Sequence, residues 1–190
     1  MNHNNQIFEF FNSKFPFNQE GLTEFSEAFR TKTYKKGSLI VGKDETENQL
    51  RFVSQGIVRE YFAHEEREMN TQFYLEGEFT TDFHLLLNQG KRRKYQESLT
   101  DTTIKQMDSA TFYEFMERYK CGKEFVDEIF SQNIMLREQE EFKHFSLTPD
   151  ELYVDLLNTK PQWLQQIPLY HIATYLRMTP ETLSRIRKRN

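Results

Sequence analysis

The segment 169–189 constrains the fold most strongly, because it carries two helix signals that are separated by only two residues. The first helix is predicted over residues 169–176, with Pro168 directly before it. The second begins at Thr179-Pro180-Glu181, where a threonine N-cap, a proline and an acidic first turn form a strong helix start. Since only residues 177–178 lie between them, the two helices must cross steeply, which predicts a helix-turn-helix.

The two faces of the second helix differ in chemistry. The expected contact between the helices is made of small and apolar residues: Ile172, Ala173, Leu176, Met178, Leu183 and Ile186. The opposite face is polar and basic, and its candidate DNA-binding residues are Thr179, Glu181, Thr182, Ser184, Arg185, Lys188 and Arg189. A helix fits the DNA major groove, where arginine can bond guanine and glutamate can accept from cytosine, while hydroxyls and terminal basic groups bond phosphates. A helical hairpin with a solvated polar face is the alternative.

The distribution of charge agrees with either interpretation. The chain carries a net charge of −4, but residues 177–190 hold five basic side chains against one acidic, a net +4, which leaves −8 on the rest. An acidic body with a basic tip indicates a polyanionic partner at one end, or else a solvated basic tail.

The pattern of residue types changes twice along the chain. Residues 5–15 and 19–30 have apolar residues at helical spacing. Between Thr31 and Asp108, short runs rich in β-branched and aromatic residues alternate with glycines, which predicts an antiparallel barrel or roll. The expected strands cover residues 50–54, 57–63, 70–75 and 97–107, with Gly56 forming a tight hairpin between the first two.

Helices are predicted again after Asp108. The first covers residues 110–118 and a longer one runs over 122–145 without internal glycine or proline. The longer helix carries a stripe of Phe125, Ile129, Gln132 and Leu136, which could pack on its own domain or pair with a copy of itself. Thr148-Pro149-Asp150-Glu151 begins another helix that ends near Asn158, and residues 160–168 are expected to be a linker.

Several classes of protein are disfavoured. The one cysteine, Cys121, forms no disulfide within the chain, and the five scattered histidines offer no metal-ligand spacing, so no metal is expected. Phosphate-binding glycine loops and hydrolase motifs are absent from the sequence, which argues against an enzyme. No run of about 18 apolar residues predicts a membrane span, and no secretory signal opens the chain. We therefore expect a cytoplasmic protein without a membrane partner.

The stretch Thr179-Pro180-Glu181-Thr182-Leu183-Ser184-Arg185 resembles the start of the recognition helix in the Crp/Fnr family of bacterial transcription regulators, with its Glu-Thr-x-x-Arg core. The resemblance covers nearly the whole chain, as a β-roll, a long helix and a helix-turn-helix. It implies that Glu181 and Arg185 read bases, that Thr182 holds a phosphate, and that the long helix forms a homodimer. Such dimers bind palindromic half-sites of double-stranded DNA roughly 34 Å apart. RNA polymerase is a further partner that the resemblance implies.

The sequence departs from this family in the turn, at Pro180 (where a base-contacting arginine is common) and in the effector cassette. Arg177 stands where the turn usually carries glycine, which predicts a left-handed residue at a cost of roughly 1 kcal/mol. The cassette that grips a cyclic nucleotide in the family aligns with Thr81-Asp82-Phe83 and Lys94-Tyr95. Thr81 replaces the glycine that permits close approach of the nucleotide to the backbone. Lys94 lacks the bidentate N–H donors of an arginine guanidinium. No cyclic-nucleotide cofactor is therefore expected in this degenerate effector pocket. The loop 90–94 could attract another anion, or be a solvated hairpin tip.

Together these observations predict an α+β chain with a jelly-roll-like N-terminal antiparallel β-roll. The expected domains are a cyclic-nucleotide-binding-like sensor roll over residues 1–121, a dimerisation helix over 122–145 and a helix-turn-helix DNA-binding domain over 146–190. The predicted function is sequence-specific transcription regulation, and a ligand sensor that does not bind DNA is the alternative.

Overall fold

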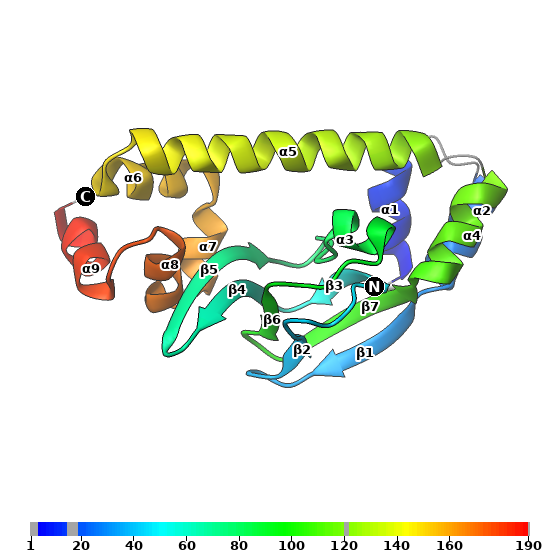
Figure 1. Ribbon diagram of the computed structural model, residues 1–190, viewed down its shortest axis with the longest axis horizontal. Helices are drawn as coiled ribbons and strands as arrows, with labels where there is room; N and C mark the ends of the chain where they lie inside the picture. The colour runs from blue at the N-terminus through cyan, green and yellow to red at the C-terminus, as the bar shows by residue number, and fades with distance from the viewer. Residues whose placement is uncertain (1–3, 15–18, 120–121, 190) are drawn as a thin grey trace.

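Two antiparallel β-sheets form the body of the protein in the computed structural model, which describes residues 4–14, 19–119 and 122–189 (Figure 1). The strands are β1 (Arg30–Tyr34), β2 (Leu39–Val41), β3 (Gln49–Gln55), β4 (Val58–His64), β5 (Arg67–Tyr74), β6 (Tyr95–Ser98) and β7 (Thr102–Asp108). One sheet has the strand order β1-β7-β3, and the other has the order β2-β6-β4-β5. The predicted antiparallel β core with flanking helices is confirmed.

Two of the predicted connections are wrong. Gly56 is not a hairpin turn, because β3 and β4 lie in different sheets and the chain crosses between the sheets at this residue. The single strand predicted over 97–107 is likewise two strands, β6 and β7, which are separated by a second crossing at 99–101. The crossings pack together: Leu99 N donates to Ile57 O over 2.8 Å, and Ile57 N donates to Thr100 Oγ1 over 3.0 Å. Gly56 has φ 95°, and a Cβ there would lie 2.7 Å from Asp101 O, so glycine is required.

The helices lie mainly at the two ends of the sheets. They are α1 (Asn4–Lys14), α2 (Gln19–Glu27), α3 (Phe83–Asn88), α4 (Ser109–Tyr119), α5 (Gly122–Ser146), α6 (Pro149–Thr159), α7 (Pro161–Gln166), α8 (Leu169–Tyr175) and α9 (Pro180–Arg189). In Figure 1, α5 runs along the molecule from the end that holds α1, α2 and α4 to the end that holds α6–α9. It is the bridge between the two groups of helices.

The N-terminal helices complete an aromatic core. Phe11 on α1, Phe25 on α2 and Phe112 on α4 are fully buried together with Phe52 of β3. The rings of Phe11 and Phe25 meet edge to face with their centroids 4.8 Å apart. Edge-to-face contacts suit aromatic rings, whose edges and faces carry opposite partial charges.

The C-terminal helices share a hydrophobic core with the β-roll rather than standing apart from it. Phe73 of β5 is fully buried and contacts Trp163 of α7, while Ile172 of α8 and Leu183 of α9 belong to the same cluster. The predicted linker over 160–168 is therefore wrong in part, because α7 lies within it and its Trp163 is buried. Thr148 and Glu151 form the reciprocal capping box that begins α6, as the sequence pattern predicts.

None of the helices in the described part of the chain is both long enough and apolar enough to cross a membrane.

Candidate nucleic-acid interface

Helix α8 ends in a tight turn that leads directly into α9. Met178 N donates to Ala173 O over 3.0 Å and Arg177 N donates to Thr174 O over 3.2 Å, which is the hydrogen-bond pattern of a Schellman motif. This motif needs a left-handed residue, and Arg177 supplies it with φ 56°. The left-handed backbone expected from the sequence at this position is confirmed. Because the connection is short and its backbone is held by hydrogen bonds, it fixes the angle between the two helices.

Helix α9 is capped at its start and buried along one side. Thr179 Oγ1 accepts a hydrogen bond from Thr182 N over 3.2 Å, as an N-cap side chain does. Leu183 and Ile186 are 1% exposed and contact the shared core, as expected from their spacing. The helix is therefore held by its apolar side, and its other side chains face away from the protein.

The outward face of α9 carries the predicted DNA-binding residues. Glu181, Ser184, Arg185 and Lys188 are exposed, and Thr182 is half-buried beside them. The Arg185 guanidinium donates to Thr182 Oγ1 over 3.3 Å, which holds it along the helix surface. Hydrogen bonds from its own backbone N–H and from Thr179 lower the pKa of Glu181, so its carboxylate stays an acceptor at neutral pH.

Arg189 is the exception among these residues. Its guanidinium contacts both carboxylate oxygens of Asp150, at 2.8 and 3.0 Å, and so ties the end of α9 to the start of α6. The sequence pattern did not predict this pair, because the two residues are far apart along the chain.

The predicted effector residues do not converge on an open site. Thr81 is buried, and its hydroxyl accepts from Arg51 N over 2.7 Å. Asp82 caps α3 by accepting from Leu85 N over 3.1 Å. Phe83 is part of the aromatic core, and Tyr95 stacks on Tyr61 with the ring centroids 5.4 Å apart. Lys94 Nζ lies 2.8 Å from Glu60 Oε1.

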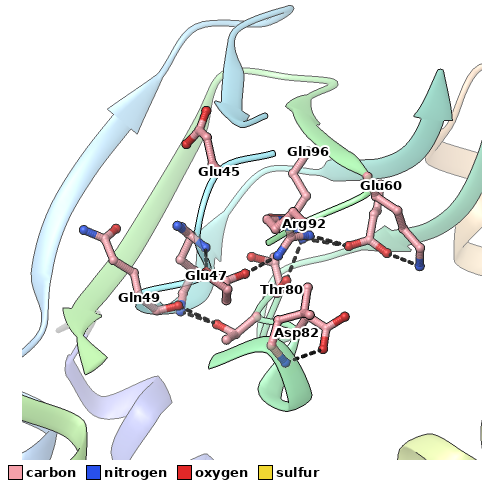
Figure 2. A network of polar contacts seen from close by, with 12 residues as sticks. Glu45, Glu47, Gln49, Glu60, Thr80, Asp82, Arg92 and Gln96 are labelled. Carbon is pink, nitrogen blue, oxygen red and sulfur yellow. Dashed lines mark hydrogen bonds and ion pairs between the residues drawn. The ribbon is translucent and has the colours of Figure 1, made fainter. Parts of the chain in front are cut away.

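A buried network of charged side chains lies in this region instead (Figure 2). Arg92 binds Glu47 through one guanidinium nitrogen and Glu60 through the other, the second at 2.7 Å. Gln96 Nε2 also donates to Glu60, over 3.1 Å, and Arg51 pairs with Glu47 at 2.6 Å. Each of these five residues is 5% exposed or less.

The electrostatics of the network favour the charged forms of Glu60 and Arg92. Burial by itself raises the pKa of Glu60, but the charges of Lys94 and Arg92 outweigh it, and the net effect lowers the pKa. Burial alone also disfavours the charged form of Arg92, but Glu47 and Glu60 raise its pKa overall. The charge of Arg92 is thus paired with two carboxylates within the protein.

Sequence reasoning missed this network because its partners are widely spaced. Arg92 belongs to the loop 90–94, and the expectation of a solvated hairpin tip is wrong for this residue, which is 2% exposed. Its backbone is fixed by Arg92 N donating to Glu45 O over 2.9 Å, which turns the side chain inward. The only signal in the sequence is a basic run beside strands that contain isolated glutamates.

Comparisons with known proteins match the fold. Residues 31–119, a little under half of the chain, match the sequence model of a family described as the cyclic nucleotide-binding domain. The match spans β1 to α4 and includes the buried network. A comparison with curated proteins found no matching sequence.

Several solved structures have the same arrangement over nearly the whole chain. FixK2 from Bradyrhizobium japonicum has a TM-score of 0.73 at 19% identity, covering 85% of this chain and 83% of that one. The catabolite activator protein of Thermus thermophilus has a TM-score of 0.60 at 18% identity, covering 95% and 85%. CLP of Xanthomonas campestris, a c-di-GMP responsive global regulator, has a TM-score of 0.66 at 12% identity, covering 90% and 91%. The protein therefore has the fold of Crp/Fnr-type regulators, with a cyclic nucleotide-binding-type β-roll.

Proposed function

We propose that the protein is a sequence-specific DNA-binding transcription regulator of the Crp/Fnr type, which acts as a homodimer. The observation that carries the proposal is the outward face of α9, where Glu181, Arg185 and Lys188 are exposed on a helix whose opposite side is firmly buried. A rigid helix with exposed polar and basic side chains can enter the major groove and present its side chains to base edges. The same α9 residues are those that resemble the recognition helix of the family.

In the DNA complex, Arg185 would bond a guanine edge and Glu181 would accept from a cytosine amino group. Thr179, Thr182, Ser184 and Lys188 would bond phosphates and set the register of docking. Arg189, which is bound to Asp150, would support the end of α9 and reach a phosphate only by sharing its donors.

A homodimer through α5 is the second part of the proposal. The side chains of Phe125, Ile129 and Gln132 lie outside those that the structure describes, whereas Leu136 is 57% exposed. Four more large apolar side chains of α5 are exposed: Ile134, Met135, Phe142 and Phe145. Apolar side chains gathered on a 25-residue helix favour pairing with a second copy.

The third part of the proposal concerns the effector site. Arg92 pairs with Glu47 and Glu60 inside the roll, so a cyclic nucleotide that binds Arg92 would have to displace buried ion pairs. We therefore propose that the protein regulates without a cyclic nucleotide, and that the degenerate pocket around Thr81, Asp82, Phe83, Lys94 and Tyr95 is closed by its own side chains.

Duplex binding by matched arginine variants tests this function. Arg185→Ala should weaken binding to the preferred duplex by about 1–3 kcal/mol and relax the base preference at one position. Arg93→Ala removes an exposed arginine from the roll and should leave binding unchanged. An equal loss on all duplexes would make Arg185 a phosphate contact only, and no salt-dependent binding by the wild type would favour a sensor without DNA binding.

A further inference from the structure

The β4–β5 hairpin has two different faces. Side chains alternate along a strand, so the neighbours Arg59 and Glu60 on β4 point to opposite sides. Glu60 points into the roll and binds Arg92 and Lys94. Arg59 points outward, where it pairs with Glu68 at 2.6 Å and Glu97 at 2.9 Å. Helix α8 packs on this outer face, where Arg59 Nη1 lies 3.5 Å from His171 Nδ1, and Figure 1 shows α8 beside β5.

A β-bulge lies in the middle of this hairpin. Glu60 pairs with Gln72 and Tyr61 pairs with Asn70, so Thr71 is the extra residue on β5. The Thr71 hydroxyl donates toward Glu60, with its oxygen 3.2 Å from Glu60 O and 3.3 Å from Oε1. Bulges change the direction in which a neighbouring side chain points. Here the bulge lies next to Asn70, whose side chain contacts α8.

Asn70 makes the central polar contact between the roll and the helix pair. Its Nδ2 donates to Thr174 Oγ1 over 2.6 Å and lies 3.3 Å from both His171 O and His171 Nδ1. The Thr174 hydroxyl in turn donates to His171 O over 3.0 Å. Asn70 is 2% exposed and His171 is 6% exposed, while Thr174 is half-buried at the edge of the contact.

Apart from Arg59 Nη1, which lies 3.5 Å from His171 Nδ1, the surrounding contacts between the roll and α8 are apolar, and apolar contacts do not set an orientation by themselves. Phe73 contacts Trp163 and Tyr175 through ring edges and tilted faces, and Ile57 joins the same cluster. Apolar burial is non-directional, whereas a hydrogen bond to a defined backbone carbonyl requires a particular placement of the helix. The amide of Asn70 is therefore suited to select one orientation of α8 from several that would bury similar area.

We propose that Asn70 is a positioning residue that fixes α8, and through the tight turn also α9, in one orientation on the β-roll. The seating of the helix pair is independent of the DNA-binding function, whereas its consequence for DNA affinity rests on that proposed function. The helix pair and the roll then move as one body. We call the surface of the β4–β5 hairpin that holds α8 the seat.

Trp163 provides a direct readout, because it is the only tryptophan in the chain and lies buried against Phe73 of the β4–β5 hairpin. Asn70→Leu keeps a similar volume but removes the donor, and Thr174→Val removes the acceptor from the other side. In both variants, we expect a red-shifted Trp163 emission and an acrylamide quenching constant at least about twofold larger, because buried polar groups without partners favour opening of the seat. The far-UV circular dichroism of the variants should match that of the wild type. Asn88→Leu and Thr159→Val are matched controls, since both side chains lie at exposed helix positions, and they should not change the quenching.

The outcomes separate the two proposals. If Asn70→Leu and Thr174→Val both leave Trp163 as protected as in the wild type, then Asn70 does not position the helices and the inference is wrong. If the quenching rises and duplex affinity falls about tenfold, which equals about 1.4 kcal/mol, both proposals are supported. If the quenching rises in the variants while the wild type binds no duplex, the positioning role of Asn70 is supported and the proposed DNA-binding function is contradicted. Should Asn70→Leu not fold, Thr174→Val alone decides the matter.

Discussion

The indole ring of Trp163 packs edge-on against the phenyl ring of Phe73, with ring centroids 4.9 Å apart and an interplanar angle of 84°. Trp163 belongs to α7 and Phe73 to β5, so this contact joins the C-terminal helices to the β-roll. Both side chains are buried, and Tyr175 of α8 closes the cluster from the other side with its ring 5.0 Å from that of Trp163. The two parts of the chain therefore share one core.

Removal of the Phe73 ring tests how much this shared core contributes to stability. Phe73→Ala should lower the free energy of unfolding by about 3–5 kcal/mol, because it deletes a fully buried ring and leaves a cavity. Urea unfolding followed by Trp163 emission and by circular dichroism would measure the loss. Leu39→Ala, at a half-exposed position, serves as the control with a small effect. A Phe73→Ala variant as stable as the wild type would show that the helices are not held by this core.

The buried ion network gives a second prediction. Glu60→Gln should destabilise the fold by about 3–5 kcal/mol, because Arg92 loses a charged partner inside the roll. Glu66→Gln on the exposed tip of the hairpin should have almost no effect. Chemical denaturation measures both changes.

Calorimetric titration of the wild type with cyclic AMP and cyclic GMP should detect no binding, and clear saturable binding would contradict the closed effector site.

His171 predicts a pH dependence of stability. Burial, followed by the charge of Arg59 on β4, lowers the pKa of His171 to about 4, while Glu68 on β5 raises it slightly. The unfolded chain therefore binds a proton below about pH 6.5 that the folded protein does not bind until about pH 4. Stability should fall as the pH drops from 6.5 to 4, and then become independent of this group.

His171→Gln is the matching variant, since its amide oxygen can still accept from Asn70. This variant should lose the part of the pH dependence between 6.5 and 4 that His171 contributes. Thermal unfolding at half-unit pH steps would show the difference. Identical pH profiles for the wild type and His171→Gln would refute the assignment of the shift to His171.

Substitution by glycine should have opposite effects on stability at Arg177 and at Arg187. Arg177→Gly should stabilise the protein by about 0.5–1 kcal/mol, because glycine adopts the left-handed backbone of the turn without strain. Arg187→Gly, within helix α9, should destabilise it by about 1 kcal/mol. Melting temperatures of the two variants would give the signs. If Arg177→Gly were destabilising, an Arg177 side-chain contact would have to outweigh the backbone strain.

The α8–α9 pair was well predicted from the sequence because its signals are local. Caps such as Thr179 and the apolar spacing of Leu183 and Ile186 lie within one or two helical turns. The left-handed Arg177 was expected because it stands where the turn of the resembled family usually carries glycine. Local patterns of this kind depend on few distant partners.

Apart from the short helix α7, the main features that were missed depend on distant pairs. Gly56 looked like a hairpin because its flanking strands are adjacent in sequence, whereas the strands pair in different sheets. The partners of Arg92 lie 45 and 32 residues away, and those of Asn70 lie more than 100 residues away. Contacts at such separations are set by the tertiary fold, and neither periodicity nor composition carries them.

The most direct test of DNA recognition by α9 is selection of bound sequences from a random duplex library with the purified wild-type protein. The enriched sequences should contain two inverted half-sites whose centres lie about 10 bp apart, one for each α9 of the dimer. The same selection with Arg185→Ala should lose the preference at one position in each half-site, while Arg93→Ala should reproduce the wild-type result. A library without enrichment, or a single asymmetric site that Arg185→Ala leaves unchanged, would contradict recognition by paired α9 helices.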